Sequence, residues 1–146
     1  PSTYLTMHAR THTHTAVQDF VSRDEQRGLG TGRALQIAVA EVLGAPVVEL
    51  HTGRYAELWL EGGQDAAAAE LERIRMAAVE ARKRGLEPHA GHGLTFDNVK
   101  PVAAIAEIAE LNIGHFLIGE AIFTGLDAAV KRMRALMDEA RAESAL

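Results

Sequence analysis

Histidines close to glycines are the side chains of this sequence with the clearest capacity for chemistry. The segment HAGHGLTF at residues 89–96 contains two imidazole rings, at His89 and His92, and two glycines. His51 and His115 also lie in or just after short apolar segments, and each is near a glycine. An imidazole moves protons near neutral pH, and glycine lets backbone N–H groups approach an anion closely. The pattern therefore indicates an anion-binding site with acid–base chemistry.

One acidic residue belongs to the same set, because Glu49 lies inside the apolar segment VVELH at residues 47–51. A buried carboxylate costs free energy unless it is paired or functional. Two structural alternatives stay open. Strand alternation could place Glu49 on a solvent-exposed face, and each histidine could be an ordinary surface or hydrogen-bonded residue.

Two motifs near the N-terminus partly match known ligand sites: one a zinc site and the other a phosphate loop. The THTHT segment at residues 11–15 places His12 and His14 on one face of an extended strand, near His8. No cysteine or acidic ligand accompanies them at zinc-binding spacing, so we expect no metal site. The GLGTGR segment at residues 28–33 lacks the GKS or GKT ending of a phosphate loop, so we interpret it as a linker.

The elements that must position these side chains alternate along the chain from residue 34 onward. Apolar residues at three-to-four spacing predict helices, and short β-branched runs predict strands. The predicted helices span residues 34–44, 65–84, 98–110 and 126–142, and the predicted strands lie within residues 46–53 and 86–91. By its pattern alone, the apolar run at residues 111–125 can be strand or helix.

This alternation indicates parallel strands joined by crossover helices, which is an α/β fold. The pattern allows either a small open sheet or part of a β/α barrel. In both architectures the ligand site lies at the carboxyl ends of the strands. We therefore expect the histidines and Glu49 to converge at one edge of the sheet.

The composition is that of a protein with one hydrophobic core, since the chain has 146 residues of which 47% are hydrophobic. The net charge of −5, with scattered Lys and Arg, argues against binding to nucleic acid or an anionic membrane. The apolar runs are shorter than the ~20 residues of a membrane span, and no export leader is visible. The absence of cysteine suits a reducing compartment, so we expect a cytoplasmic protein.

The first 33 residues differ from the rest of the chain. They contain four Arg against three acidic residues, three His and little apolar periodicity. We therefore predict an atypical, poorly ordered N-terminal segment at residues 1–33 and an α/β domain at residues 34–146. The abrupt change also motivates the hypothesis of a frame-shifted or chimeric start, which the upstream coding sequence would test.

Three motifs, taken together and in order, resemble a known family. They are VVELHTGRYA, HAGHGLTFDNV and ELNIGHFLIGEAIFTGLDAAVKRM. Over roughly residues 36–142 the chain resembles the C-terminal half of pyridoxine 5′-phosphate synthases. That family folds as a TIM (β/α)8 barrel, so the resemblance implies a partial barrel. VVELH, LEPHAG and ELNIG would be strands six, seven and eight, and HFLIGEAIF would be a short phosphate-binding helix.

The resemblance also implies a reaction and a set of site residues. The family condenses 1-deoxy-D-xylulose 5-phosphate with 3-amino-2-oxopropyl phosphate to give pyridoxine 5′-phosphate, phosphate and water. His92 would be the proton donor, and Glu49 would stabilise the transition state. Gly93, Gly114 and His115 would bind the amino-ketone phosphate. No metal or organic cofactor is implied, and the family's octamers imply a homo-oligomer.

Part of the family's catalytic set has no counterpart among these residues. The resemblance places a catalytic His and Glu, together with the residues for the second substrate phosphate, on the first five strands. We therefore expect this chain alone to be inactive. A non-catalytic phosphate-binding or assembly fragment and another phosphate-handling barrel enzyme are the alternatives. The lack of a lysine at a predicted strand end counts against an aldolase. The role of His89 stays open.

Overall fold

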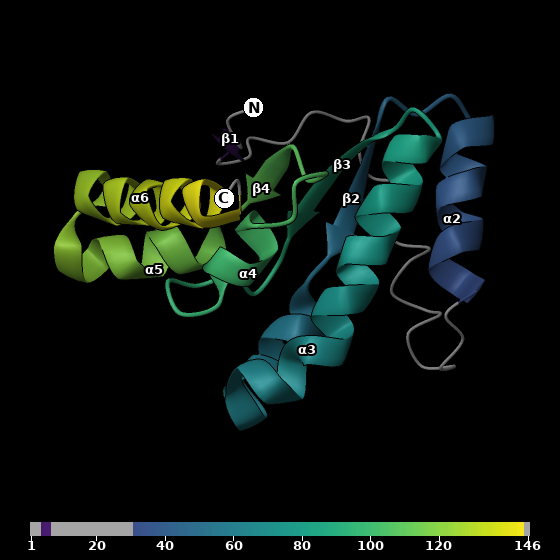
Figure 1. The fold of residues 1–146 in the computed structure, drawn as a ribbon. Helices are drawn as coiled ribbons and strands as arrows, with labels where there is room; N and C mark the ends of the chain where they lie inside the picture. Colours follow the sequence, from purple (N-terminus) through teal and green to yellow (C-terminus); the bar gives the residue numbers. More distant parts are fainter. Residues whose placement is uncertain (1–3, 7–30, 145–146) are drawn as a thin grey trace.

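The computed structural model describes residues 4–6 and 31–144, which form a parallel sheet covered by helices (Figure 1). The sheet has the order β1-β4-β3-β2, and every neighbouring pair of strands is parallel. This confirms the α/β class. The strands are β1 (Tyr4–Thr6), β2 (Val47–His51), β3 (Glu87–Gly91) and β4 (Glu110–Asn112).

Five helices connect or flank these strands in the described part of the chain. Helix α3 packs on β2 and β3, α2 packs on α3, and both α4 and α5 pack on α6. The helices are α2 (Thr31–Val42), α3 (Gly53–Lys83), α4 (Val99–Ala103), α5 (His115–Thr124) and α6 (Leu126–Ser144). The run at residues 111–125, which was ambiguous by pattern, is the end of a strand followed by a helix.

The observed helix bounds differ from the predicted ones at three places. Helix α2 begins at residue 31 instead of 34, and α3 begins at residue 53, well before the predicted start at 65. The backbone of α3 is non-helical at Gly62 and Gly63, which divides the helix close to that predicted start. The helix predicted at residues 98–110 ends at Ala103, because the following residues join the sheet: the N–H of Ala109 donates to the carbonyl of Pro88 at 2.9 Å.

The two faces of the sheet have different characters. Successive side chains of a strand point to opposite faces. Val48, Leu50 and Leu111 are buried in the hydrophobic core on the helix side. Glu49 and His51 therefore lie on the opposite face, where the strand register sets Glu49 beside His89. Glu49, His51 and His89 therefore share this second face.

The N-terminal segment includes one element that the prediction of irregular structure did not contain. The strand Tyr4–Thr6 pairs in parallel with β4 and extends the sheet there. Residues 7–30, which include the THTHT segment and the first half of the GLGTGR segment, lie outside the described residues, and the predicted disorder and linker there stay predictions. The second half of GLGTGR begins α2, so the linker interpretation is wrong for residues 31–33.

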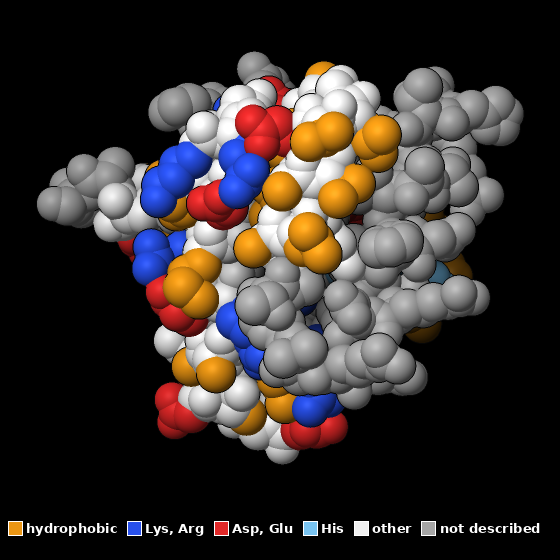
Figure 2. Space-filling model, turned by 90° about the vertical axis from the view of Figure 1, so that its right-hand side faces the viewer, with side chains coloured by type: hydrophobic (Ala, Val, Ile, Leu, Met, Phe, Trp, Pro, Cys, Tyr) orange, Lys and Arg blue, Asp and Glu red, His pale blue; other side chains and the backbone are white. Residues whose placement is uncertain are grey.

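Helix α2 presents an apolar face to solvent. Figure 2 shows hydrophobic side chains gathered on the side of the molecule that α2 forms. Val42 is 85% exposed, and the neighbouring Leu43 is 72% exposed. Leu35 and Val39 are also exposed on this helix. Across the described ranges, no helix combines the length and the apolar character that crossing a membrane requires.

Candidate active site

The carboxyl ends of β2, β3 and β4 lie at one edge of the sheet, because the three strands are parallel. Strand β2 ends at His51, β3 at Gly91 and β4 at Asn112. His92 follows β3 directly, and one residue separates Gly114 from the end of β4. The predicted convergence is therefore seen for His51, His92 and the Gly114–His115 pair, but not for His89, which lies within β3.

A carboxylate and an imidazole face each other at this edge. Oε1 of Glu49 lies 3.6 Å from Nε2 of His92. Oε2 of Glu49 accepts a hydrogen bond of 2.8 Å from Nδ2 of Asn112. The Glu49 side chain is only 15% exposed, whereas that of His92 is 53% exposed. Glu49 is therefore not on an exposed face, and its burial is compensated by the hydrogen bond from Asn112.

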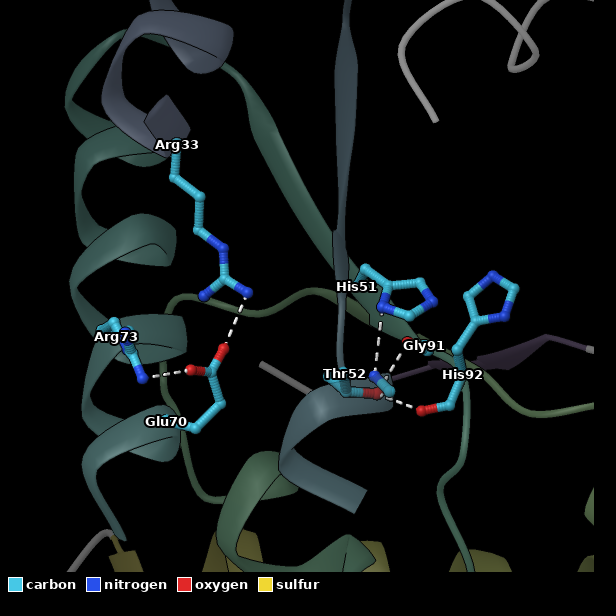
Figure 3. A network of polar contacts seen from close by, with 8 residues as sticks. Arg33, His51, Thr52, Glu70, Arg73, Gly91 and His92 are labelled. Carbon is cyan, nitrogen blue, oxygen red and sulfur yellow. Dashed lines mark hydrogen bonds and ion pairs between the residues drawn. The ribbon is translucent and has the colours of Figure 1, made fainter. Parts of the chain in front are cut away.

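The backbone of His92 is held in an unusual conformation. Its φ is +80°, in the left-handed region that residues other than glycine rarely adopt. Oγ1 of Thr52, which is fully buried, lies 2.6 Å from the carbonyl oxygens of both Gly91 and His92 (Figure 3). The N–H of Thr52 also donates to the carbonyl of Gly91 at 2.7 Å. These bonds clamp the end of β3 and hold His92 where its ring reaches the site.

A second histidine lies against the first. The rings of His51 and His92 stack with their centroids 4.6 Å apart and an angle of 29° between their planes. Nδ1 of His51 accepts a hydrogen bond of 3.2 Å from the N–H of Gly53 (Figure 3). A Cβ at Gly53 would lie 2.3 Å from Cε1 of His51, so glycine at this position makes room for the ring. Neutral His51 therefore carries its proton on Nε2.

The loop that follows His92 is fixed by internal hydrogen bonds. Nδ2 of Asn98 donates to the carbonyl of Gly93 at 3.1 Å, and Oδ1 of Asn98 accepts from the N–H of Thr95 at 2.8 Å. The hydroxyl of Tyr55 donates to the carbonyl of Asn98 at 2.8 Å, and burial raises the pKa of Tyr55. Gly93 has a φ of +75°, and a Cβ there would lie 2.6 Å from the Cβ of Ala56. The absence of a side chain at Gly93, as at Gly91, therefore lets neighbouring protein atoms pack closely against the HAGHG turn.

The other two predicted site residues begin α5. Gly114 is the N-cap residue of this helix, His115 is its first residue, and both are exposed. Phe96, from the loop after β3, contacts Phe116 edge to face with the ring centroids 4.8 Å apart. This contact brings the first turn of α5 against the loop that carries His92. A helix N-terminus presents unpaired N–H groups that favour a phosphate.

His89 lies inside β3 and not at the strand end. It is 8% exposed, its Nε2 lies 2.9 Å from Oε1 of Glu87, and its Nδ1 lies 3.7 Å from Oε1 of Glu110. Of the two readings that the sequence left open for this residue, the geometry favours a hydrogen-bonded structural histidine. Among the described residues, no group of three or more His, Cys, Asp or Glu is arranged to hold a metal ion.

Three residues that shape the site were not among the predicted ones. Thr52 and Asn98 act on the backbone around His92, and Asn112 acts on Glu49. Asn112 precedes the Gly114–His115 pair by two residues, and its position at a strand end is a signal that could have singled it out. Thr52 also follows a strand end, but nothing in the sequence marks its partners, which are backbone carbonyls about 40 residues away. Asn98 has no such signal, because it lies in a loop and its partner is a backbone carbonyl 5 residues away.

Known proteins are similar to most of this chain. The family described as Pyridoxal phosphate biosynthesis protein PdxJ matches residues 14–139, so the match begins within the N-terminal segment. A pyridoxine 5′-phosphate synthase of Zymomonas mobilis is 62% identical over 108 residues, which cover 74% of this chain and 41% of that protein. One from a Caulobacter species is 60% identical over 110 residues, covering 75% of this chain and 44% of that protein. The chain thus spans about two fifths of the length of the curated relatives it matches.

Proposed function

This chain belongs to the family described as Pyridoxal phosphate biosynthesis protein PdxJ, and we propose that it carries part of the active site of a pyridoxine 5′-phosphate synthase. The reaction is the condensation of 1-deoxy-D-xylulose 5-phosphate with 3-amino-2-oxopropyl phosphate. It gives pyridoxine 5′-phosphate, phosphate and water. The observation that carries the proposal is the pairing of Glu49 with His92, whose Oε1 and Nε2 atoms lie 3.6 Å apart at the carboxyl edge of the sheet.

In this proposal His92 is the proton donor. Its half-exposed ring is open to a substrate, and Glu49 lies on one side of it. A proton given by the imidazole to a departing hydroxyl group releases that group as water. Glu49 stabilises positive charge that develops on an imine-like intermediate, because its carboxylate is mostly removed from water and already oriented.

Gly93, Gly114 and His115 hold the phosphate of the amino-ketone substrate in this proposal. The exposed position of Gly114 at the start of α5 supports it, since no atom approaches within 4 Å of a Cβ placed there. The contact between Phe96 and Phe116 supports it as well, because it keeps this helix end beside the loop of His92. These groups supply carboxylate, imidazole and backbone N–H chemistry, and the proposed reaction uses no metal or organic cofactor.

We further propose that β2, β3 and β4 are strands six, seven and eight of a TIM (β/α)8 barrel. Three features support this assignment: the strands are parallel, helices join them in sequence, and the short helix α5 precedes α6. A cytoplasmic location suits the cysteine-free sequence.

A homo-oligomer is also part of the proposal. One observation also favours the alternative of a non-catalytic assembly fragment, namely the exposed apolar side chains of α2. In a turnover assay of this chain with both substrates, only a positive result would distinguish the enzyme from the assembly fragment. We expect no detectable product from the chain alone, and measurable product formation would contradict that expectation.

Calorimetric titration with 3-amino-2-oxopropyl phosphate tests the substrate site directly. We expect the chain to bind it, and Glu49→Gln to weaken binding by about tenfold, because the variant removes the charge that faces the substrate amine. Glu61→Gln, which neutralises an exposed carboxylate on α3, is the matched control and should leave the affinity unchanged. Absence of binding, or equal losses in both variants, would overturn the proposal.

A further inference from the structure

The side chain of Asn112 makes one hydrogen bond within the described part of the chain, and its partner is Glu49. Nδ2 of Asn112 donates to Oε2 of Glu49 at 2.8 Å. Oδ1 of Asn112 is buried, and none of the described residues donates a hydrogen bond to it. An ionised carboxylate can only accept hydrogen bonds, so the amide must turn its NH2 group toward Glu49. The orientation of the amide is therefore set by Glu49 and by no other described group.

This hydrogen bond crosses the middle strand. Glu49 lies on β2 and Asn112 lies on β4, and β3 separates them. A Cβ at Gly91 would lie 2.7 Å from the carbonyl oxygen of Asn112 and 3.0 Å from Oε1 of Glu49. The first of these neighbours is backbone, which cannot move aside cheaply. The missing side chain at Gly91 is what lets the carboxylate and the amide meet over β3.

The bond also decides which oxygen of Glu49 is available. Oε2 is occupied by Asn112, and Oε1 faces Nε2 of His92 at 3.6 Å. A carboxylate without the amide could rotate about its terminal torsion, which is broad for glutamate. Asn112 is also two residues before Gly114, so the residue that orients Glu49 belongs to the strand end that leads into α5.

We propose that Asn112 is the positioning residue of this site: it holds Glu49 so that one carboxylate oxygen faces His92, and Gly91 is the spacer that makes the bond possible. The proposal rests on the proposed function for the role of Glu49 toward substrate. Asn112 acts through Glu49 and needs no contact with the substrate itself.

A thermodynamic cycle on substrate affinity tests the proposal. Asn112→Leu keeps the approximate size and removes the donor, and it should weaken binding of 3-amino-2-oxopropyl phosphate by about tenfold. In a Glu49→Ala background the same substitution should change the affinity by less than about twofold, because its partner is already gone. Equal losses in both backgrounds would overturn the proposal. Gln64→Leu removes an exposed amide on α3 and is the control.

A measurement without ligand keeps the two proposals separate. In amide-detected NMR spectra of the chain, the side-chain NH2 signals of Asn112 should move in both Glu49→Ala and Gly91→Ala. Signals that stay in place in Glu49→Ala would overturn the positioning role, even if Asn112→Leu fails to fold. If the unsubstituted chain does not bind the amino-ketone phosphate, the proposed function fails, and these signals still decide whether Asn112 holds Glu49.

Discussion

Oγ1 of Thr52, which follows β2, lies 2.6 Å from the carbonyl oxygen of His92, which follows the adjacent strand β3. The same hydroxyl lies 2.6 Å from the carbonyl oxygen of Gly91. The Thr52 hydroxyl is therefore within hydrogen-bond distance of two successive carbonyl groups, at the point where the backbone of His92 is left-handed. Such a conformation costs about 1–3 kcal/mol and persists only when its surroundings hold it.

Replacing Thr52 by Val should weaken the contact between the two strand ends. The variant keeps the shape of the side chain and the N–H bond to Gly91, and it removes the hydroxyl donor from the carbonyls of Gly91 and His92. We therefore expect the free energy of unfolding to fall by about 1–3 kcal/mol. Urea denaturation followed by circular dichroism measures the loss. Thr124→Val is the control, because the exposed hydroxyl of Thr124 donates to the carbonyl of Glu120 within α5. Similar losses in the two variants would contradict the clamp.

Gly93→Ala should be destabilising although it adds one methyl group. The φ of +75° disfavours a side chain, and the new Cβ would lie 2.6 Å from the Cβ of Ala56. We expect a loss of about 2 kcal/mol or more in the free energy of unfolding, from backbone strain and overpacking.

Gly119→Ala is the matched control for that substitution. Gly119 lies within α5, and nothing lies within 4 Å of a Cβ placed there. Alanine in an open helical position should stabilise the protein by about 0.5–1 kcal/mol. Thermal denaturation should show a lower melting temperature for Gly93→Ala and a higher one for Gly119→Ala. A stabilised Gly93→Ala would contradict the close approach of Gly93 to Ala56.

Tyr55 should resist ionisation at alkaline pH. It is fully buried, and burial raises its pKa well above the usual value of about 10. Below pH ~10 both folded and unfolded chains carry the neutral phenol; above that pH the unfolded chain ionises first, so stability falls by up to ~1.4 kcal/mol per pH unit. The Tyr4→Phe variant leaves Tyr55 as the one tyrosine.

Absorbance at the phenolate band tests this in the Tyr4→Phe background. We expect phenolate to appear together with unfolding and not before it. A further Tyr55→Phe substitution should remove this part of the alkaline stability loss and serves as the reference. Ionisation of Tyr55 near its usual pKa in a folded chain would contradict its burial.

Glu70 should contribute more to stability than its neighbour Glu72. Glu70 is nearly buried and forms ion pairs of 2.7 Å with both Arg33 and Arg73 (Figure 3). The pair with Arg33 connects α2 to α3, whereas Arg73 lies one turn away on α3 itself. Glu70→Gln removes the charge that both cations share, and we expect a loss of about 1–3 kcal/mol in unfolding free energy. Glu72 is paired with Arg75 on the exposed surface, so Glu72→Gln should cost less than about 1 kcal/mol. Equal effects in urea denaturation would show that burial does not strengthen the Glu70 contacts.

The proposed self-association predicts a mass above that of the 15.7 kDa chain in light scattering after size-exclusion chromatography. Val42→Glu places a charge on the exposed face of α2, where residue 42 is 85% exposed. If that face is the contact surface, the variant should dissociate toward the monomer. Lys131→Glu, at an exposed position of α6, is the control. A monomeric unsubstituted chain would contradict the proposal of a homo-oligomer.

The fold and part of the site could be predicted from the sequence because their signals are local. The alternation of strand and helix patterns predicted the α/β class, and glycines beside histidines predicted a site at the strand ends. The predicted helix at residues 98–110 was wrong beyond Ala103, because the apolar pattern contains no information about where the chain must return to β3. The predicted disorder of residues 7–30 remains a prediction.

By itself the sequence determined which residue types stand at the carboxyl ends of parallel strands. The reason is that strand length and the order of elements depend on local propensity and on the period of the hydrophobic residues. The tertiary structure decided which atoms of those residues meet. Glu49 meets Asn112 only because Gly91, on the strand between them, has no side chain. His92 reaches Glu49 only because Thr52, about 40 residues earlier, holds its backbone in a left-handed turn. Contacts between segments far apart in the chain leave no periodic trace in either segment, so packing alone sets them.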